Sequence, residues 1–412
     1  MLKKLLRKRP ALAWVASLYL CQGIPYAVVS LMASILFHQL GLANSLTALV
    51  SSLLLLAWFV KPLWAPKLEE NQKEQRLIVI LQALMALVLA LIAISLMIPK
   101  PFWLLTLLFM SLAFLGACYD TASDSLYLRR ISNEEQMRLV GFRSFFYQMG
   151  RLSVQSGFIM LAAYLQWKIT FIIMSIFMLC AMLWHSYALP KDPSHINIKS
   201  SRWLPAFIQS IKRYITMPHA GPSILFLLLF NFAEAQIIRV TPLFLLDKHS
   251  DGGLQLDLTH TGLLLGAFGL IALAIGSWLA DFITPRLTLR KSLILMAWLM
   301  AASNLAYIFL AMHTQTDWLI IASLIFITQF VYGLANATYL GYTVALAQYH
   351  EGSISCFSIS MAIMSLGWII PGSFSGYLAE TWHYTGFFIW TVLSGIGIAL
   401  YTHYLPTCPA RS

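Results

Sequence analysis

Charged residues are scarce in this sequence. They make up 10% of the 412 residues, whereas 59% are hydrophobic and the mean hydropathy is +0.75. Ordinary soluble domains carry about 25% charged residues, so this composition excludes a soluble globular domain. The sequence therefore predicts a protein that crosses a membrane several times.

Cysteines and catalytic motifs are also few. The five cysteines include no CxxC pair and mostly fall in apolar segments, which argues against a zinc site and a disulfide framework. The sequence contains no Walker A, HExxH or GxSxG motif, the patterns typical of ATP hydrolysis, metalloproteases and serine hydrolases. We therefore expect no enzyme activity, no cofactor and no bound metal.

Apolar stretches of about twenty residues, long enough to cross a bilayer as helices, recur along the whole chain. They predict an all-α membrane protein with twelve spans, at about 11–37, 45–64, 77–98, 102–127, 139–165, 168–189, 221–246, 259–283, 291–313, 317–347, 354–380 and 384–405. The longest connection divides them six and six. The predicted parts are an N-terminal half, a linker with an interfacial helix and a C-terminal half, at residues 1–189, 190–220 and 221–412.

Most basic residues lie in short loops on one predicted side of the membrane. The other side has only Lys100, Lys168 and Lys248. Cytoplasmic loops carry an excess of Lys and Arg, so both termini are predicted to lie in the cytoplasm. The net charge of +11 is thus explained by topology, and we expect membrane lipid rather than nucleic acid as a partner.

Two acidic and two basic residues fall inside predicted spans 4 and 5, where an unpaired charge costs at least about 2.5–3.5 kcal/mol. Asp120 and Asp124 are spaced i,i+4 and so share one helix face. Arg143 has a shallow depth similar to that of Asp124, which predicts a structural or gating pair. Arg151 is about 20 Å from the inner end of its span, near the midplane.

The midplane of predicted span 7 carries the complementary charge, Glu234, with Asn231 and Arg239 near it. A guanidinium such as Arg151 is suited to holding a carboxylate or phosphate through two hydrogen bonds. A desolvated carboxylate can exchange a proton near neutral pH, and Asp120 competes with Glu234 for this role. Alternatively, Glu234 and Arg151 form a static salt bridge or gate.

Two further segments contain candidate residues. Gln22-Gly-Ile-Pro-Tyr26 predicts a kink in span 1, because glycine and proline weaken a helix there. Gln22 and Tyr26 would then face a substrate cavity, although a purely structural bend is equally compatible. Lys61 ends span 2 at the inner surface, where it would either extend to the interface or take part in a gate.

The two halves share a weak repeat. Gly116 to Asp124 on span 4 aligns by position with Gly333 to Gly341 on span 10. Six plus six spans with an internal repeat is the plan of the major facilitator superfamily, in which the substrate site lies between the halves near the midplane.

The sequence resembles the AmpG branch of that superfamily in several blocks, of which the Trp-Ala-Pro and Asp-x-x-x-Asp patterns are fairly specific. These blocks are Gln22-Gly-Ile-Pro-Tyr26, Lys61-Pro-Leu-Trp-Ala-Pro66, Tyr119-Asp-Thr-Ala-Ser-Asp124 with Gly141-Phe-Arg143, and Phe232-Ala-Glu-Ala-Gln236. Asp281, followed by Arg286, keeps a trace of the superfamily's general gating motif. Glu69 and Glu70 depart from the Asp-Arg pair that is usual in the family.

The resemblance implies proton-driven import of anhydro-muropeptides, fragments of peptidoglycan, across the bacterial cytoplasmic membrane during cell-wall recycling. Related twelve-span proteins import siderophores such as pyochelin or rhizobactin, so a siderophore importer is the nearest alternative. A non-transporting membrane sensor with the same fold is a third hypothesis. The expected partners are a small anionic substrate and a proton, and the expected state is a monomer.

Overall fold

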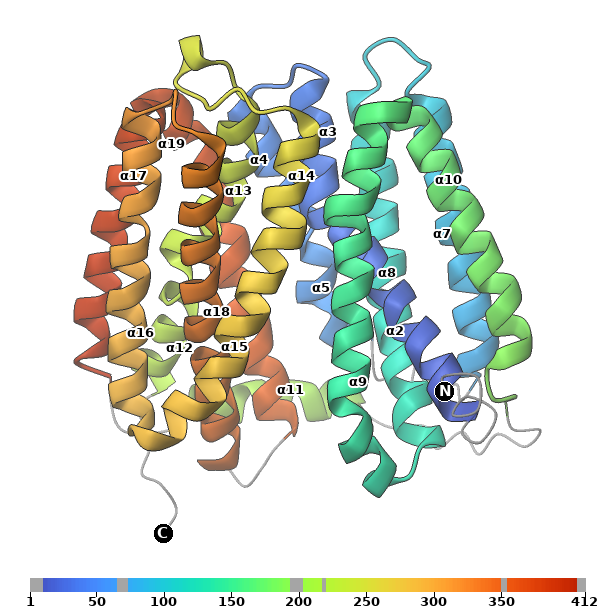
Figure 1. Ribbon diagram of the computed structural model, residues 1–412. Helices are drawn as coiled ribbons and strands as arrows, with labels where there is room; N and C mark the ends of the chain where they lie inside the picture. The colour runs from blue at the N-terminus through green and yellow to red at the C-terminus, as the bar shows by residue number, and fades with distance from the viewer. Residues whose placement is uncertain (1–9, 65–72, 193–202, 217–219, 350–353, 406–412) are drawn as a thin grey trace. The chain divides into compact units, whose positions relative to one another are not determined.

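The computed structural model describes residues 10–64, 73–192, 203–216, 220–349 and 354–405 (Figure 1). Every regular element in this described part is a helix, and nine helices are long and apolar enough to cross a membrane. Two of them, Gly141–Ala188 and Ile359–Thr402, reverse direction at Gln166 and His383, where φ is 66° and 54°. Each of these two helices therefore accounts for two predicted spans. Together with the other seven long helices and the shorter apolar helix Asn44–Val60, they account for the twelve predicted spans.

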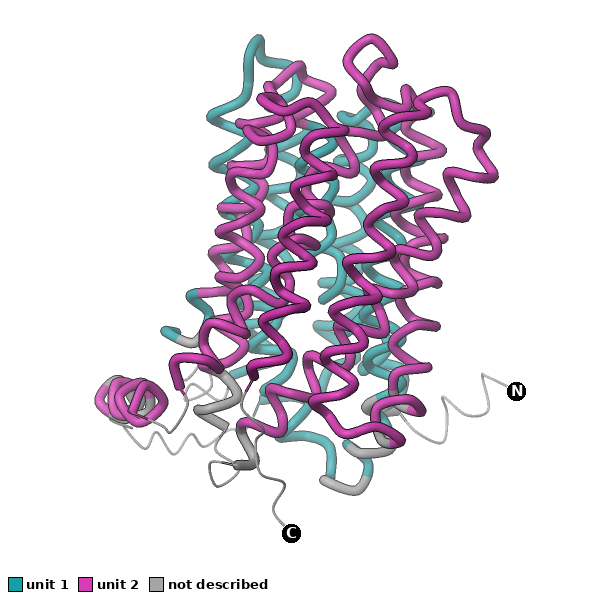
Figure 2. Tube along the Cα trace, turned by 90° about the vertical axis from the view of Figure 1, so that its left-hand side faces the viewer, with its two compact units in different colours: residues 1–36, 60–203 teal, residues 37–59, 204–412 magenta. Residues whose placement is uncertain are grey.

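The chain forms two compact units, which Figure 2 colours separately. Unit 1 consists of residues 1–36 and 60–203, and unit 2 of residues 37–59 and 204–412. The helices of unit 1 are α2 (Pro10–Ala27), α7 (Glu74–Ser95), α8 (Phe102–Arg130), α9 (Asn133–Leu152) and α10 (Ile159–Ala188). Helix α3 (Ala33–Gln39) leads from unit 1 into unit 2.

Unit 2 begins with a segment that the sequence places between spans 1 and 3. Its helices are α4 (Asn44–Leu53), α5 (Leu56–Val60), α11 (Trp203–Ile215), α12 (Ala220–Leu229), α13 (Phe232–Leu246), α14 (Leu258–Gly262), α15 (Gly269–Ile283), α16 (Leu289–Ser303), α17 (Leu305–Met312), α18 (Trp318–Tyr349) and α19 (Ile354–Thr402). Helix α4 packs against α13 and α19. Packing therefore joins span 2 to two helices that begin about 190 and about 310 residues after α4 begins.

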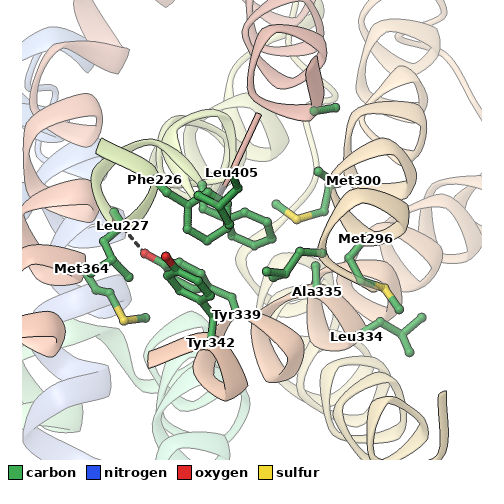
Figure 3. Packing of buried hydrophobic residues seen from close by; sticks show 14 of the residues in the cluster. Phe226, Leu227, Met296, Met300, Leu334, Ala335, Tyr339, Tyr342, Met364 and Leu405 are labelled. Atoms are coloured by element: carbon green, nitrogen blue, oxygen red, sulfur yellow. Dashed lines mark hydrogen bonds between the residues drawn. The ribbon is translucent and has the colours of Figure 1, made fainter. Parts of the chain in front are cut away.

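A cluster of aromatic rings forms part of the core of unit 2. Figure 3 shows Phe226, Tyr339 and Tyr342 close together, with the Tyr339 hydroxyl donating to the carbonyl of Leu227 at 2.5 Å. The ring of Phe230 stacks on that of Tyr339 with centroids 4.6 Å apart. These contacts hold α12, the first half of span 7, in place. They therefore also fix where α13, the second half of the span, begins.

Helices α2 and α9 of unit 1 cross with their backbones in contact. A Cβ atom added to Gly150 would lie 2.0 Å from the carbonyl oxygen of Leu20, and one added to Gly23 would lie 2.2 Å from that of Tyr147. Small residues at such crossings allow the backbones of two helices to approach closely in a bilayer. The crossing lies one residue before Arg151, so it sets the position of that guanidinium.

We expect Gly150→Val to destabilise unit 1 by about 1–3 kcal/mol, because the added side chain would meet main-chain atoms that cannot rotate away. The measurement is the apparent Tm of the detergent-purified protein. Gly157→Val is the matched control, since an added Cβ there meets no atom within 4 Å. Equal Tm values for the two variants would contradict the proposed tightness of the crossing.

Candidate functional site

Arg151 lies at the end of α9, and its guanidinium is held from two sides. The Cζ atom is 5.5 Å from the centroid of the Tyr26 ring, a cation–π arrangement. Nη1 donates to Oε1 of Gln148 at 3.1 Å. Nε is buried and has no hydrogen-bond partner among the described residues. One buried donor of this half-buried side chain is thus left for a ligand.

Each of the two helices that carry Tyr26 and Arg151 changes from an α-helix to a π-helix close to that residue. A π-helical turn, Val28–Met32, begins two residues after Tyr26, and another, Ser153–Phe158, begins two residues after Arg151. Such turns are rare and occur frequently at functional sites. The π-helical turn Val28–Met32 and Pro25 in α2 agree with the predicted kink in span 1.

Two buried amide oxygens near the crossing also lack partners in the described chain. They are Oε1 of Gln22, next to Gly23, and Oε1 of Gln155, four residues after Arg151. Both side chains are 6% exposed. Gln155 was missed by the sequence analysis, although a polar residue one helical turn from Arg151 in an apolar span is a recognisable signal. Together these side chains offer one cationic donor and two acceptors.

Asp120 has a cation beside it. Nζ of Lys61 lies 4.0 Å from Oδ2 of Asp120, which is buried on α8. Lys61 thus takes part in an ion pair inside unit 1 instead of extending to the membrane interface. The hydroxyl of Tyr147 is also close enough to interact electrostatically with Asp120 and Arg151. A partner cation makes Asp120 less suited to exchange protons than a carboxylate without one.

Asp124 and Arg143 lie together, as their similar depth predicts. Nη2 of Arg143 is 3.9 Å from Oδ1 of Asp124, and the Tyr19 hydroxyl donates to the same oxygen at 3.0 Å. The Arg143 guanidinium lies over the rings of Tyr19 and Tyr127, at 4.9 and 5.1 Å from their centroids. Both charged side chains are about one-third exposed, at 33% and 35%, so the pair is weaker than a fully buried one.

We expect removal of either charge, by Asp124→Asn or Arg143→Gln, to cost about 1–3 kcal/mol, because each charge would lose its partner. The double variant Asp124→Arg with Arg143→Asp should recover part of this loss. Recovery should be incomplete because an aspartate at position 143 cannot replace the cation–π contacts with Tyr19 and Tyr127. A double-mutant cycle on the apparent Tm measures the coupling, and strictly additive effects would exclude the pairing.

Glu234 is buried in unit 2 without a cation. It lies on α13 just after the interruption between α12 and α13, is 2% exposed, and forms no ion pair with the described residues of its unit. The side chain of Asn304 faces it from the interruption between α16 and α17. Asn304 was missed by the sequence analysis, although an asparagine in the middle of a predicted apolar span was a usable signal.

Several polar atoms around Glu234 have no hydrogen-bond partner in the described chain. They are Oε1 of Glu234, both amide atoms of Asn231 and Nδ2 of Asn304. Asn231 and Asn304 are 2% and 1% exposed. A carboxyl group in such surroundings must be neutralised by a proton or accept hydrogen bonds from groups that move toward it, since a buried charge without a partner is costly.

Arg239 and Glu234 have different neighbours, as their i,i+5 spacing predicts. Arg239 is buried beside Gly372 of α19, where an added Cβ would lie 3.2 Å from Cγ of Arg239 and 2.7 Å from Oγ of Ser52. It therefore lies against α4 and α19. The side chain of Asp281, the remaining predicted gating residue, lies outside the part that the structure describes.

Comparison with known proteins agrees with this architecture. The sequence profile of the Major Facilitator Superfamily matches residues 15–357. AmpG 4 of Rickettsia conorii, named as a transporter, is 24% identical over 370 residues, which cover 85% of this chain and 86% of that protein.

Solved structures of transporters share the fold. The nucleoside transporter NupG has a TM-score of 0.73 and 16% identity, covering 96% of this chain and 98% of its own. The inward-open xylose transporter XylE from E. coli has a TM-score of 0.68 and 16% identity, with coverages of 97% and 96%. The chain therefore belongs to the Major Facilitator Superfamily of membrane transporters, and its sequence resemblance is to the AmpG type.

Proposed function

We propose that this chain is a secondary active importer that carries an anionic sugar-peptide of the anhydro-muropeptide class, together with protons, across the bacterial inner membrane. In this proposal residues 1–189 and 221–412 are the two halves that move against each other, and both termini lie in the cytoplasm. The AmpG resemblance supports the substrate class, and the excess of basic residues on one side supports the orientation.

The observation that carries the proposal is the unused Nε donor of Arg151. A guanidinium donor that is buried inside a membrane protein needs an acceptor, and Gln148 and Tyr26 engage only other parts of the Arg151 side chain. An incoming carboxylate would complete its hydrogen bonding and balance its charge. The free donor therefore favours an anionic substrate.

The partnerless amides favour a substrate that also brings hydrogen-bond donors. Gln22 and Gln155 each present a buried oxygen that needs an N–H or O–H group. A muropeptide supplies carboxylates on its peptide and hydroxyl and amide N–H groups on its sugars and peptide. A siderophore of the pyochelin type carries a carboxylate but fewer donors, so we place it second.

For the proton, the surroundings favour Glu234 over Asp120. Asp120 has Lys61 at 4.0 Å, whereas the neighbours of the buried Glu234 include the amide of Asn304 and the hydroxyl of Tyr307, neither of which is a cation. A protonated Glu234 needs no counter-charge and can give up its proton when the surrounding helices rearrange. Asn231 and Arg239, on the same span, remain candidates for substrate contact.

Two measurements test this function. Purified protein is titrated with an anhydro-muropeptide, a pyochelin-type siderophore and a neutral disaccharide. Proteoliposomes are then assayed for uptake of each ligand that binds, with and without an imposed pH gradient. We expect binding and gradient-driven uptake of the muropeptide only. Binding without uptake would instead support a membrane sensor, and siderophore uptake would support the second candidate.

A further inference from the structure

Four polar side chains meet at the end of unit 2 opposite α11, the upper end in Figure 1. His38 is near the end of α3, Asn44 begins α4, Asp247 directly follows α13, and Tyr384 follows the reversal at His383 in α19. None of the four was a candidate in the sequence analysis, because they are separated by up to 346 residues.

Asp247 accepts hydrogen bonds from the other three. Nε2 of His38 lies 3.1 Å from Oδ1, and Nδ2 of Asn44 lies 3.0 Å from Oδ2, to which the Tyr384 hydroxyl also donates. Asn44 Nδ2 further contacts the Tyr384 hydroxyl at 3.0 Å. The carboxylate of Asp247 thus contacts one hydrogen-bonding side chain from each of three helical segments, α3, α4 and α19.

The imidazole of His38 is in contact at both of its ring nitrogens. Its second ring nitrogen, Nδ1, lies 3.2 Å from Oδ1 of Asn44, while the amide nitrogen of Asn44 is engaged with Asp247 and so fixes which amide atom faces the ring. Both ring nitrogens therefore face oxygen acceptors. The ring of His38 thus links Asp247 to Asn44.

The backbone around this network is also held tightly. The Ser45 amide donates to Oε1 of Glu380 at 2.8 Å, and a Cβ added to Gly376 would lie 2.1 Å from the carbonyl oxygen of Asn44. The loop after α13 folds back, with the Gln255 amide donating to the Asp247 carbonyl at 2.8 Å. The start of α4 is thus fixed to α19 by both side-chain and main-chain contacts.

These contacts join segments from the two proposed halves. His38 and Asn44 belong to residues 1–189, whereas Asp247 and Tyr384 belong to residues 221–412. Alternating access requires the halves to separate at each end in turn. We propose that His38, Asn44, Asp247 and Tyr384 form a clamp that holds the extracytoplasmic end closed, and that its release is the step that admits substrate. This inference rests on the proposed transport function.

The protonation of Asp247 supports this assignment. Burial opposes the charged form, but hydrogen bonds from His38, Tyr384 and Asn44 and the charge of His38 lower the pKa of Asp247 below its ordinary value. A lowered pKa means that the clamp stabilises the closed state above the ordinary pKa of an aspartate, and that this contribution is lost as the pH falls through the lowered value. Among the described residues, Glu380 accepts from the Ser45 amide beside the clamp, Asp251 interacts electrostatically with Tyr384, and Lys248 follows Asp247 in the chain.

The test traps the clamp with a disulfide. Ser45→Cys with Glu380→Cys places two thiols across the contact between α4 and α19, and oxidation should stop uptake in proteoliposomes until a reductant is added. In this background, Asp247→Asn and His38→Gln should each slow disulfide formation by about tenfold, because each removes a charged hydrogen bond. Asp251→Asn, which removes an exposed charge from the neighbouring loop, is the matched control and should not change the rate.

The outcomes separate the clamp from the proposed function. Unchanged crosslinking rates in folded Asp247→Asn and His38→Gln proteins would overturn the clamp, as would uptake that continues in the oxidised pair. If Asp247→Asn does not fold, Tyr384→Phe replaces it and removes only the hydroxyl donor. Crosslinking that responds to the clamp variants in a protein that transports none of the tested ligands would contradict the proposed substrate and leave the clamp supported.

Discussion

Arg151→Lys is expected to lower the affinity for an anionic substrate by about tenfold to a hundredfold. Lysine keeps the positive charge but replaces a planar fork of donors with a single ammonium group. It would lose the unused Nε donor, the hydrogen bond to Gln148 and part of the contact with the Tyr26 ring. Charged hydrogen bonds contribute about 1.5–3 kcal/mol each, which sets the expected range.

The measurement for Arg151→Lys is the Kd of the purified protein for the ligand that binds wild type, compared with the apparent Tm of the same sample. Arg130→Lys is the control, because Arg130 is an exposed arginine at the end of α8 and the same change there should not alter binding. An Arg151→Lys protein that binds and transports as well as wild type would show that Arg151 does not hold the substrate.

Glu234→Gln is expected to abolish accumulation of substrate against its gradient while exchange of substrate across the membrane continues. Glutamine has the shape of a protonated glutamate and can still face Asn304, but it cannot release a proton. The carrier should then equilibrate substrate, so the ratio of internal to external substrate should fall to about one. A residue that binds substrate would instead lose both activities when replaced.

The assay compares uptake driven by a pH gradient with counterflow exchange in the same proteoliposomes. Glu135→Gln, at an exposed carboxylate near the start of α9, should retain both activities. Asp120→Asn should behave differently from Glu234→Gln, because it leaves Lys61 without its partner and so lowers stability as well as transport. Uphill accumulation by the Glu234→Gln protein would exclude Glu234 as the proton carrier and make Asp120 the candidate.

The sequence predicted the spans well because each one is a local property of the chain. A bilayer demands about twenty apolar residues per helix, and the reversals at Gln166 and His383 fall in the gaps predicted at those places. The depth of Asp124 and Arg143 could also be estimated, since a continuous helix rises by a constant amount per residue. Their contact at 3.9 Å agrees with that estimate of depth.

The sequence did not predict which distant residues meet. The pairing of Lys61 with Asp120 and the position of Asn304 opposite Glu234 depend on how helices pack, which residue spacing within one span does not determine. The grouping of α4 with α13 and α19 and the clamp around Asp247 have the same origin. Such contacts require a three-dimensional structure, because a single sequence contains no record of proximity.

The glycine contact between α2 and α9 has a consequence for how the transporter can move. Gly23 and Gly150 place two main chains against each other, and larger side chains on either side hinder sliding of one helix along the other. Rotation about the contact point is less restricted, so the crossing resembles a pivot. Arg151 is the next residue after that pivot, and a small rotation of α9 would therefore re-aim its side chain while hardly displacing its Cα atom.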